Sequence, residues 1–214
     1  MTDRHPTRKP TPLNTAQVVY IVDDDASMRE ALLDLLLSVQ IEAASFSTAK
    51  ELLDTGDLQR AGCILLDVRL PGLNGLEFQS HLEKIGNRMP IVFMTGHGDI
   101  PMTVQAMKAG AVDFLTKPFR DQDLLDAVTS AFARDTAVRK VSEASCAVFE
   151  LAKMLTPREK EVMASVVQGL MNKQIAFNLG ISEITVKLHR GNVMRKMDVR
   201  SVAELVRKAE LMGL

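Results

Sequence analysis

The sequence predicts an α/β domain built on a parallel five-stranded sheet, followed by a smaller all-α domain. Between residues 17 and 134, five short β-branched runs alternate with five helix-like segments, which is typical of a sheet covered on both faces. After residue 151 only helical periodicity remains. Residues 1–134 carry 13 Lys and Arg against 18 Asp and Glu, whereas residues 135–214 carry 13 against 9. Two domains are therefore expected, and the basic second one suits a polyanionic partner.

The elements can be assigned in chain order. Residues 1–16 are polar, contain three prolines and lack periodicity, so they are expected to form a disordered arm. In the first domain, residues 17–134, we expect strands over 18–22, 41–46, 63–68, 91–95 and 112–115, and helices over 27–39, 48–53, 75–85, 100–109 and 121–133. Residues 135–150 are predicted to be a linker that is helical at least in part. The second domain, residues 151–214, is expected to contain helices over 157–168, 172–179, 182–197 and 201–211.

The composition excludes several classes of protein. At 214 residues, 46% hydrophobic and 25% charged, the chain is typical of a soluble globular protein. It has no apolar leader and no apolar run of about 18 residues, so neither export nor membrane insertion is expected. Its two cysteines, Cys63 and Cys146, are too far apart for a metal motif. A reducing cytoplasm is the predicted location.

Polar residues end four of the predicted strands. Asp23 and Asp24 follow the first strand, Asp67 ends the third, Thr95 ends the fourth and Lys117 follows the fifth. Because the carboxyl ends of parallel strands meet at one edge of the sheet, these side chains are expected to lie together. Three close carboxylates repel one another unless a cation joins them, and their oxygens suit Mg²⁺ or Mn²⁺. One such aspartate is more often a turn or helix cap, but the combination predicts a metal site.

The motifs "IVDDD", "LLDVRLPG", "VFMTGHG" and "DFLTKPF" resemble the receiver domain of two-component response regulators, a flavodoxin-like (βα)5 fold. The resemblance covers residues 17–133. It implies that Asp67 is the phosphoacceptor, that Asp24 is the principal metal-binding acid with Asp23 as the second, and that the backbone carbonyl of Arg69 completes the metal site. This chemistry needs a metal to neutralise the nucleophile and the incoming phosphoryl group.

The same resemblance assigns the remaining receiver positions. It implies that Thr95 and Lys117 bind the phosphoryl oxygens, that Phe114 is the aromatic switch residue, and that the Lys117–Pro118 peptide bond is cis. His97 is given no role, and Asp99 is expected to be the N-cap of the following helix. On the helix over 100–109, Met102, Val104 and Ala106 are either core residues or part of a surface that changes on phosphorylation, and the sequence leaves both open.

An aspartyl phosphatase of the haloacid-dehalogenase type is the competing enzyme hypothesis. That family places a second acid two residues after the nucleophile, but this chain has Arg69 there. We therefore predict that the protein is not an enzyme, apart from Mg²⁺-dependent self-phosphorylation from a donor and slow autodephosphorylation. A degenerate receiver that takes no phosphate is a further alternative, although no acid, hydroxyl or lysine position is missing.

The basic second domain contains a predicted helix-turn-helix, with Ser182 as N-cap of its second helix. On that helix Val186, Val193 and Met197 form a stripe that is expected to be buried. The opposite face is expected to carry Ile184, Lys187, Leu188, Gly191 and Arg195. A basic helix end also complements the helix dipole, so charge alone does not establish a nucleic-acid site.

The wording "LTPREKEV", "NKQIA" and "TVKLHRGNV" resembles the LuxR-type helix-turn-helix of the FixJ/NarL response regulators over residues 151–211. The resemblance implies that residues 183–197 enter the DNA major groove, with Lys187 and Leu188 facing base edges. It also implies phosphate contacts from Lys173, Thr185, Arg190, Asn192 and Arg195. Gly191 departs from the pattern, because a larger side chain often reaches the groove there. Either the backbone approaches DNA closely at this position or that contact is absent.

Together the two resemblances predict a response regulator that a sensor histidine kinase phosphorylates on Asp67. Phosphorylation would control homodimer formation and sequence-specific binding to promoter DNA, with RNA polymerase as a further partner and activation as the expected effect. The alternative from another class is a constitutive DNA-binding protein whose receiver serves only for assembly.

Overall fold

The computed structural model describes residues 17–70, 72, 74–96 and 100–214 of the chain, without the side chains of residues 100–102. The predicted N-terminal arm and the predictions for His97, Asp99 and the side chain of Met102 lie outside this part. Within it, the predicted α/β domain and the helical domain that follows are confirmed.

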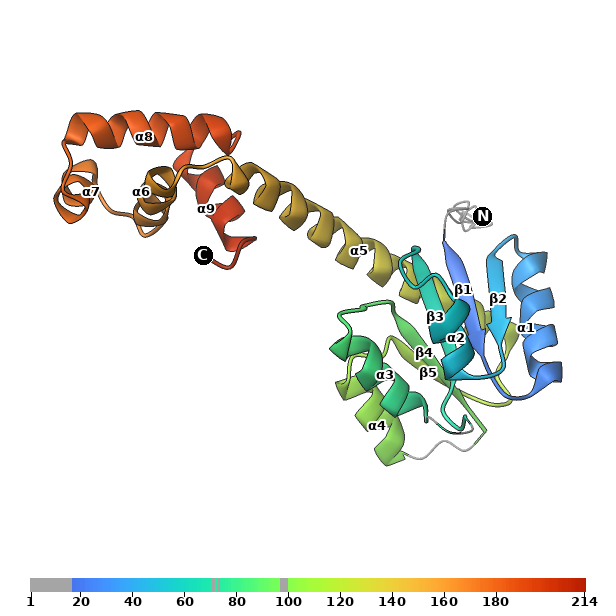
Figure 1. Cartoon of the computed structure of the whole chain (residues 1–214). Helices are drawn as coiled ribbons and strands as arrows, with labels where there is room; N and C mark the ends of the chain where they lie inside the picture. Colours follow the sequence, from blue (N-terminus) through green and yellow to red (C-terminus); the bar gives the residue numbers. More distant parts are fainter. Residues whose placement is uncertain (1–16, 71, 73, 97–99) are drawn as a thin grey trace, which may run out of the picture. The chain divides into compact units, whose positions relative to one another are not determined.

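The first unit is a five-stranded sheet in which every strand pair is parallel (Figure 1). Its strands are β1 Val18–Val22, β2 Glu42–Phe46, β3 Gly62–Asp67, β4 Ile91–Thr95 and β5 Asp113–Thr116, in the spatial order β2-β1-β3-β4-β5. The strand order reverses at β1 and β3, so the carboxyl ends of these two central strands form the switch point at which such sheets bind ligands.

Helices cover both faces of this sheet because its strands are apolar on both sides. They are α1 Ala26–Ser38, α2 Ala49–Thr55, α3 Gly75–Lys84, α4 Ile100–Lys108 and α5 Asp121–Lys153. Alternate residues of β1 enter different cores: Tyr20 packs in the core that includes residues of α2, α3 and α4, and Ile21 packs in the core shared with α1 and α5. On α4, Ala106 is a core residue, whereas the side chain of Val104 is exposed.

Helix α5 is the one element whose predicted bounds are wrong by more than two residues. The helix expected over 121–133 continues to Lys153, and residues 135–150 are helical throughout. No glycine or proline occurs between residues 121 and 153, so nothing in the local sequence ends the helix. Backbone contacts divide the chain into residues 1–138 and 139–214, so the helix carries residues of both units.

The second unit contains α6 Pro157–Val167, α7 Asn172–Leu179, α8 Glu183–Lys196 and α9 Val202–Glu210, which pack around one core. Gly180 ends α7 in the left-handed conformation (φ 65°), and the Ser182 side chain then accepts a hydrogen bond from the backbone N–H of Thr185 at the start of α8. The predicted stripe of Val186, Val193 and Met197 is buried. In the described ranges, no helix has the length and apolar character needed to cross a bilayer.

Candidate functional site

Three aspartates gather at the carboxyl ends of the central strands. Asp67 is the last residue of β3, and Asp23 and Asp24 directly follow β1, its hydrogen-bonded neighbour. Each of the three offers a carboxylate oxygen within 4.8 Å of the others. Asp23 is fully buried and Asp67 is 7% exposed, whereas Asp24 is exposed to solvent. The parallel sheet thus brings together acids that are more than 40 residues apart in the chain.

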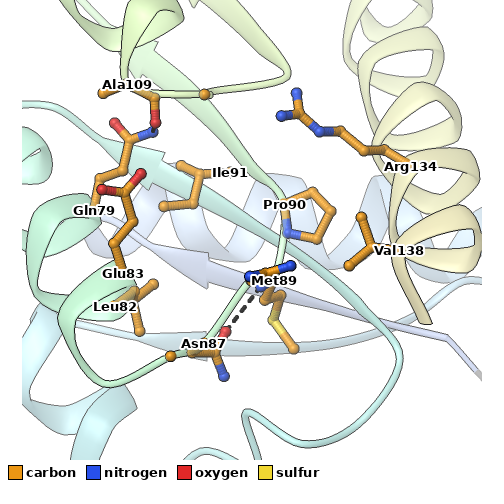
Figure 2. Close-up of a pocket in the computed structure, with 13 residues that line it drawn as sticks. Gln79, Leu82, Glu83, Asn87, Met89, Pro90, Ile91, Ala109, Arg134 and Val138 are labelled. Atoms are coloured by element: carbon orange, nitrogen blue, oxygen red, sulfur yellow. Dashed lines mark hydrogen bonds between the residues drawn. The ribbon is translucent and has the colours of Figure 1, made fainter. Parts of the chain in front are cut away.

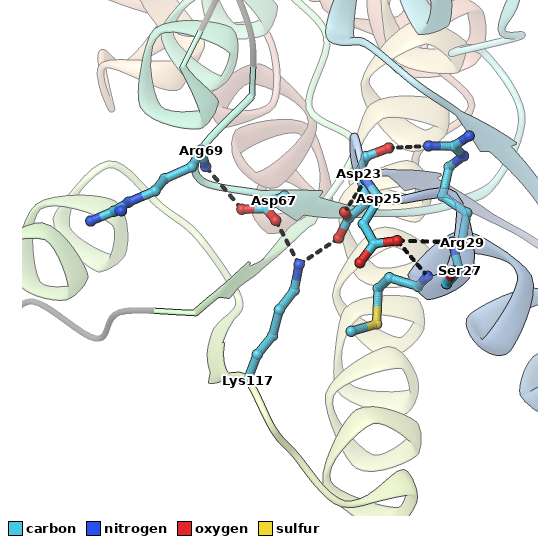
Figure 3. Close-up of polar contacts among 8 residues, drawn as sticks. Asp23, Asp25, Ser27, Arg29, Asp67, Arg69 and Lys117 are labelled. Atoms are coloured by element: carbon cyan, nitrogen blue, oxygen red, sulfur yellow. Dashed lines mark hydrogen bonds and ion pairs between the residues drawn. The ribbon is translucent and has the colours of Figure 1, made fainter.

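Lys117 connects two of these carboxylates. Its Nζ donates to Oδ2 of Asp23 and to Oδ2 of Asp67, each at 2.6 Å (Figure 3). The Lys117 side chain is 16% exposed, so water screens both ion pairs only in part. Lys117 extends to the acids from the segment after β5, and its backbone N–H donates to the carbonyl oxygen of Thr95 at 2.7 Å.

Burial and charge oppose each other at this site. Burial raises the pKa of Asp23, and the hydrogen bond from Lys117 offsets part of that increase. Burial by itself lowers the pKa of Lys117, but the hydrogen bonds and charges of Asp23 and Asp67 outweigh it and raise the pKa above its ordinary value. Lys117 therefore remains charged at neutral pH.

The donor set fits a divalent cation. Three carboxylates and one ammonium leave two negative charges uncompensated within the cluster. Carboxylate oxygens at a rim that water reaches through exposed Asp24 are the ligands that Mg²⁺ prefers, since Mg²⁺ retains part of its hydration shell.

Arg69 presents its backbone rather than its side chain to the acids. The Arg69 N–H donates to Oδ1 of Asp67 at 2.9 Å, while the exposed guanidinium points away from that carboxylate (Figure 3). Both oxygens of Asp67 therefore have a donor, one from the turn after β3 and one from Lys117. The second acid that a phosphatase of the competing type would need is replaced by a side chain directed elsewhere.

Two further predicted residues lie in neighbouring strands. Thr95 is fully buried at the end of β4. Phe114 in β5 is half-buried and packs beside its register partner Phe93, with ring centroids 6.4 Å apart. The Lys117–Pro118 peptide bond is cis, which confirms the prediction.

Sequence reasoning missed the residues that orient the acids. Asp25 caps α1 by accepting from the N–H groups of Ser27 and Met28, and its own N–H donates to Oδ1 of Asp23 at 3.0 Å. Nη1 of Arg29 donates to the Asp23 carbonyl oxygen at 2.7 Å. An aspartate just before a helix is a capping signal that could have identified Asp25. The Arg29 contact depends on a side-chain direction that no sequence pattern specifies.

In the second unit, the predicted DNA-facing side of α8 is exposed. Ile184 is 80% exposed and Leu188 is 64% exposed, and Lys187, Gly191 and Arg195 are exposed as well. Ile184 and Leu188 lie one turn apart on this face, and exposed apolar side chains that cluster indicate an interaction surface more than single ones do. On α7, Lys173 is also exposed.

Several polar residues of this unit have partners within it. Nη1 of Arg190 donates to Oδ1 of Asn172 at 2.7 Å, so Arg190 links α8 to α7. Nη2 of Arg195 donates to Oδ1 of Asn192 at 3.2 Å, and Thr185 contacts the Ser182 hydroxyl. Thr185, Arg190 and Arg195, which the sequence assigns to DNA phosphates, thus each have a hydrogen-bonding partner within the unit.

Lys196, in the C-terminal part of α8, has an acidic partner in α6. Its Nζ lies 2.7 Å from Oε2 of Glu159, whose side chain is 4% exposed. Glu159 also accepts from the Thr156 N–H as part of the capping box of α6. The hydrogen bond from Lys196 is the main reason why the pKa of Glu159 lies below its ordinary value.

Gly191 has no structural reason to be glycine. Apart from its chain neighbours and the backbone of α8 itself, no atom would lie within 4 Å of a β-carbon built at this position, and Gly191 lies inside α8 without a positive φ. A glycine in a helix interior costs about 1 kcal/mol relative to alanine. The unit therefore loses stability at a position where its own packing would accept a side chain.

A cleft of about 470 Å³ lies at the other end of the sheet, where β4 begins. In Figure 2, Gln79 and Glu83 of α3 form one wall and Arg134 of α5 the other, with Ile91 and Pro90 between them. The amide oxygen of Gln79 is buried and has no hydrogen-bond partner in the described part of the chain. None of the strand-end acids lines this cleft, and neither does Thr95 or Lys117.

The sheet with its acidic switch point and the helix-turn-helix unit define a signal-receiver domain joined to a DNA-binding domain. Residues 19–129 match the family described as "Response regulator receiver domain", and residues 153–209 match "Bacterial regulatory proteins, luxR family". The chain belongs to the two-component response regulators that combine these two domains, and it acts in transcriptional regulation.

Similar proteins include regulators of this arrangement. Nodulation protein W of Bradyrhizobium diazoefficiens is 50% identical over 95% of this chain and 90% of its own length. Response regulator protein TodT of Pseudomonas putida is 45% identical over 91% and 86%. Among solved structures, response regulator StyR is 47% identical with a TM-score of 0.77, covering 91% of this chain and 98% of its own. Full-length FixJ from B. japonicum is 40% identical with a TM-score of 0.57, covering 94% and 98%.

Proposed function

We propose that Asp67 is the residue through which a histidine kinase controls this regulator. The observation that carries the proposal is the environment of Asp67: Oδ1 is held by the Arg69 N–H, Oδ2 by Lys117, and the acids Asp23 and Asp24 lie alongside. A carboxylate fixed from both sides is oriented for attack, and positioning contributes most of what phosphoryl transfer requires of a protein.

In the proposed transfer, an oxygen of Asp67 forms a bond to phosphorus while the P–N bond of the kinase's phosphohistidine breaks. The imidazole released from phosphorus takes its proton from solvent. Lys117 is already within hydrogen-bonding distance of Asp67, so its ammonium is positioned to offset negative charge on the phosphoryl oxygens. Buried Thr95, at the end of the next strand, supplies a hydroxyl at the same edge of the sheet.

Asp23, Asp24, Asp67 and the backbone carbonyl of Arg69 would hold Mg²⁺ or Mn²⁺. When bound, the cation neutralises the attacking carboxylate and the phosphoryl group. The residues of the chain keep this cluster in place without it. Lys117 joins Asp23 to Asp67, the Asp25 N–H holds the Asp23 carboxylate, and Arg29 holds the Asp23 backbone carbonyl.

Phosphorylation of Asp67 is proposed to shift a conformational equilibrium. Movement of Thr95 toward the phosphoryl oxygens would open space that Phe114 enters, because the Phe114 ring is only half-buried and already packs against Phe93. We infer that the exposed face of α4, which includes Val104 and Met107, changes as a result and forms a homodimer.

The dimer is proposed to bind promoter DNA through α8 and to act on RNA polymerase as an activator. In the assigned contacts, Lys187 and Leu188 face base edges, and Lys173, Thr185, Arg190, Asn192 and Arg195 contact phosphates. The exposure of Lys187, Leu188, Lys173 and Arg195 supports these roles.

Phosphate transfer from acetyl phosphate tests the proposal directly. Full-length protein and Asp67→Asn are incubated with the donor, with and without Mg²⁺, and intact mass and sizing are recorded. We expect a Mg²⁺-dependent gain of one phosphoryl group in the wild type only, followed by a larger species.

A gain that persists in Asp67→Asn would place the phosphate elsewhere, and no gain would favour a receiver that serves only for assembly. Repeated turnover of the donor would instead indicate a phosphatase. A gain without a change in size would retain Asp67 as the acceptor and remove dimer formation from the proposal.

A further inference from the structure

The exposed face of α8 carries an aliphatic stripe that ends at a glycine. Ile184, Leu188 and Gly191 are spaced four and three residues apart, so they lie on one side of the helix. This side is opposite the buried stripe of Val186 and Val193. Ile184 and Leu188 are 80% and 64% exposed, so neither contributes substantially to the core of the unit.

Gly191 makes a notch in this stripe. The position lies one turn beyond Leu188 and Lys187, and Arg195 follows one turn later. Long side chains therefore border a point where the backbone of α8 is bare. Alanine would be more stable in the same helix and would meet no atom within 4 Å beyond its chain neighbours and the backbone of α8, so the packing of the unit does not account for the glycine.

We propose that the stripe of Ile184, Leu188 and Gly191 recognises thymine methyl groups in the major groove, and that Gly191 lets a base edge approach the backbone of α8. The proposal rests on the DNA-binding role of α8. The C5-methyl of thymine is the apolar group that base edges display in the major groove, so it is the natural counterpart of exposed aliphatic side chains. Lys187 and Arg195 border the stripe and favour a polyanion over an apolar protein surface.

Close approach of DNA to Gly191 and the mere absence of a base contact at this position predict different results. If a contact were merely absent, a methyl group at this position would leave DNA binding unchanged. If DNA occupies the notch, the β-carbon of Gly191→Ala collides with it, and binding weakens while the helix becomes more stable.

The test begins with the full-length protein, treated with acetyl phosphate and Mg²⁺, which is used to enrich binding sites from a random DNA library. Affinity is then measured for the enriched duplex and for copies in which each thymine in turn is replaced by deoxyuridine, which lacks only the methyl group. We expect a loss of about fourfold at one or two adjacent thymines.

Three variants complete the experiment. Gly191→Ala should weaken binding to the enriched duplex by about tenfold or more, because the loss of binding free energy from the added β-carbon should be similar to that from one mismatched base pair. It should also raise the melting temperature of the DNA-binding unit by about 4 °C. Leu188→Ala should abolish the difference between thymine and deoxyuridine. Gln168→Ala, at an exposed position after α6, is the matched control and should bind as the wild type does.

Other results would overturn the proposal. If Gly191→Ala enriches the same sequence and binds it with unchanged affinity, DNA does not occupy the notch. If no replacement of thymine by deoxyuridine changes the affinity of the wild type, the methyl contact is excluded. Leu188→Ala that binds DNA normally but fails to support transcription with purified RNA polymerase would make the stripe a protein contact. If the wild-type protein enriches no sequence from the library, both the DNA-binding role of α8 and the proposed approach of DNA to Gly191 are wrong.

Discussion

Replacing Lys117 by methionine tests whether one cation holds the acidic site together. The ammonium lies 2.6 Å from a carboxylate oxygen of Asp23 and 2.6 Å from one of Asp67. Methionine keeps an unbranched side chain but removes the charge, so two largely buried carboxylates face each other without a counterion. The receiver should therefore lose stability at neutral pH when no divalent cation is present.

The magnitude follows from the geometry. Carboxylate oxygens of the cluster lie within 4.8 Å of one another. Two unit charges at this separation repel by roughly 3.5 kcal/mol at an effective dielectric constant of about 20. Water reaches the site through the partly exposed Lys117 side chain and screens part of this repulsion, so we expect the free energy of unfolding to fall by about 2–3 kcal/mol. In urea this corresponds to a decrease in midpoint of about 1 M.

The single tyrosine of the chain provides the assay. The protein has one tyrosine and no tryptophan, and Tyr20 lies in β1, where it is 4% exposed and its hydroxyl donates to the Asp57 carbonyl oxygen at 2.8 Å. Tyr20 fluorescence during urea unfolding therefore reports on the receiver and not on the DNA-binding unit. Lys50→Met, at an exposed position of α2, is the control for replacing lysine by methionine.

Magnesium separates electrostatics from packing. A cation bound by the acids replaces part of the missing charge, so Mg²⁺ should stabilise Lys117→Met more than it stabilises the wild type. The reasoning is refuted if Lys117→Met unfolds at the same urea concentration as Lys50→Met, or if Mg²⁺ stabilises wild type and variant equally.

Three further predictions follow from named contacts. Lys196→Met leaves buried Glu159 without its ammonium and should lower the free energy of unfolding of the DNA-binding unit by about 2 kcal/mol, measured by circular dichroism. The pKa of Glu159 is lowered in the folded state, so the contribution of its carboxylate to the free energy of unfolding is complete above the ordinary glutamate pKa. That contribution is lost as the pH falls through the lowered pKa, and Lys196→Met should lack this sensitivity to acid. Gly62→Ala places a β-carbon 2.0 Å from the Val18 carbonyl oxygen and should destabilise the receiver by about 3 kcal/mol or more, whereas an unchanged Tyr20 midpoint would contradict the clash. Lys173→Ala should reduce the slope of log K against log salt for DNA binding by about 0.9, and an unaltered slope would remove its assigned phosphate contact.

Local patterns were sufficient for most elements. β-branched runs and helical periodicity placed the elements to within two residues, except at the end of α5. There the pattern changes from a helix packed on the sheet to a helix exposed at Val141 and Phe149, and the loss of apolar periodicity resembles a linker. The absence of glycine and proline from residues 121–153 was the better indicator, because adding residues to an existing helix is favourable until a helix-breaking residue intervenes.

The sequence by itself determined that Asp23, Asp24, Asp67, Thr95 and Lys117 belong to strand ends, because the order of strands and helices in a parallel sheet sends those ends to one edge. Which atoms meet was decided only by the tertiary structure. Lys117 joins Asp23 to Asp67, and Lys196 is paired with Glu159, 37 residues away. The open surroundings of Gly191 were likewise visible only after folding. Periodicity specifies which face a residue occupies, whereas partners and empty space depend on side chains brought together from distant parts of the chain.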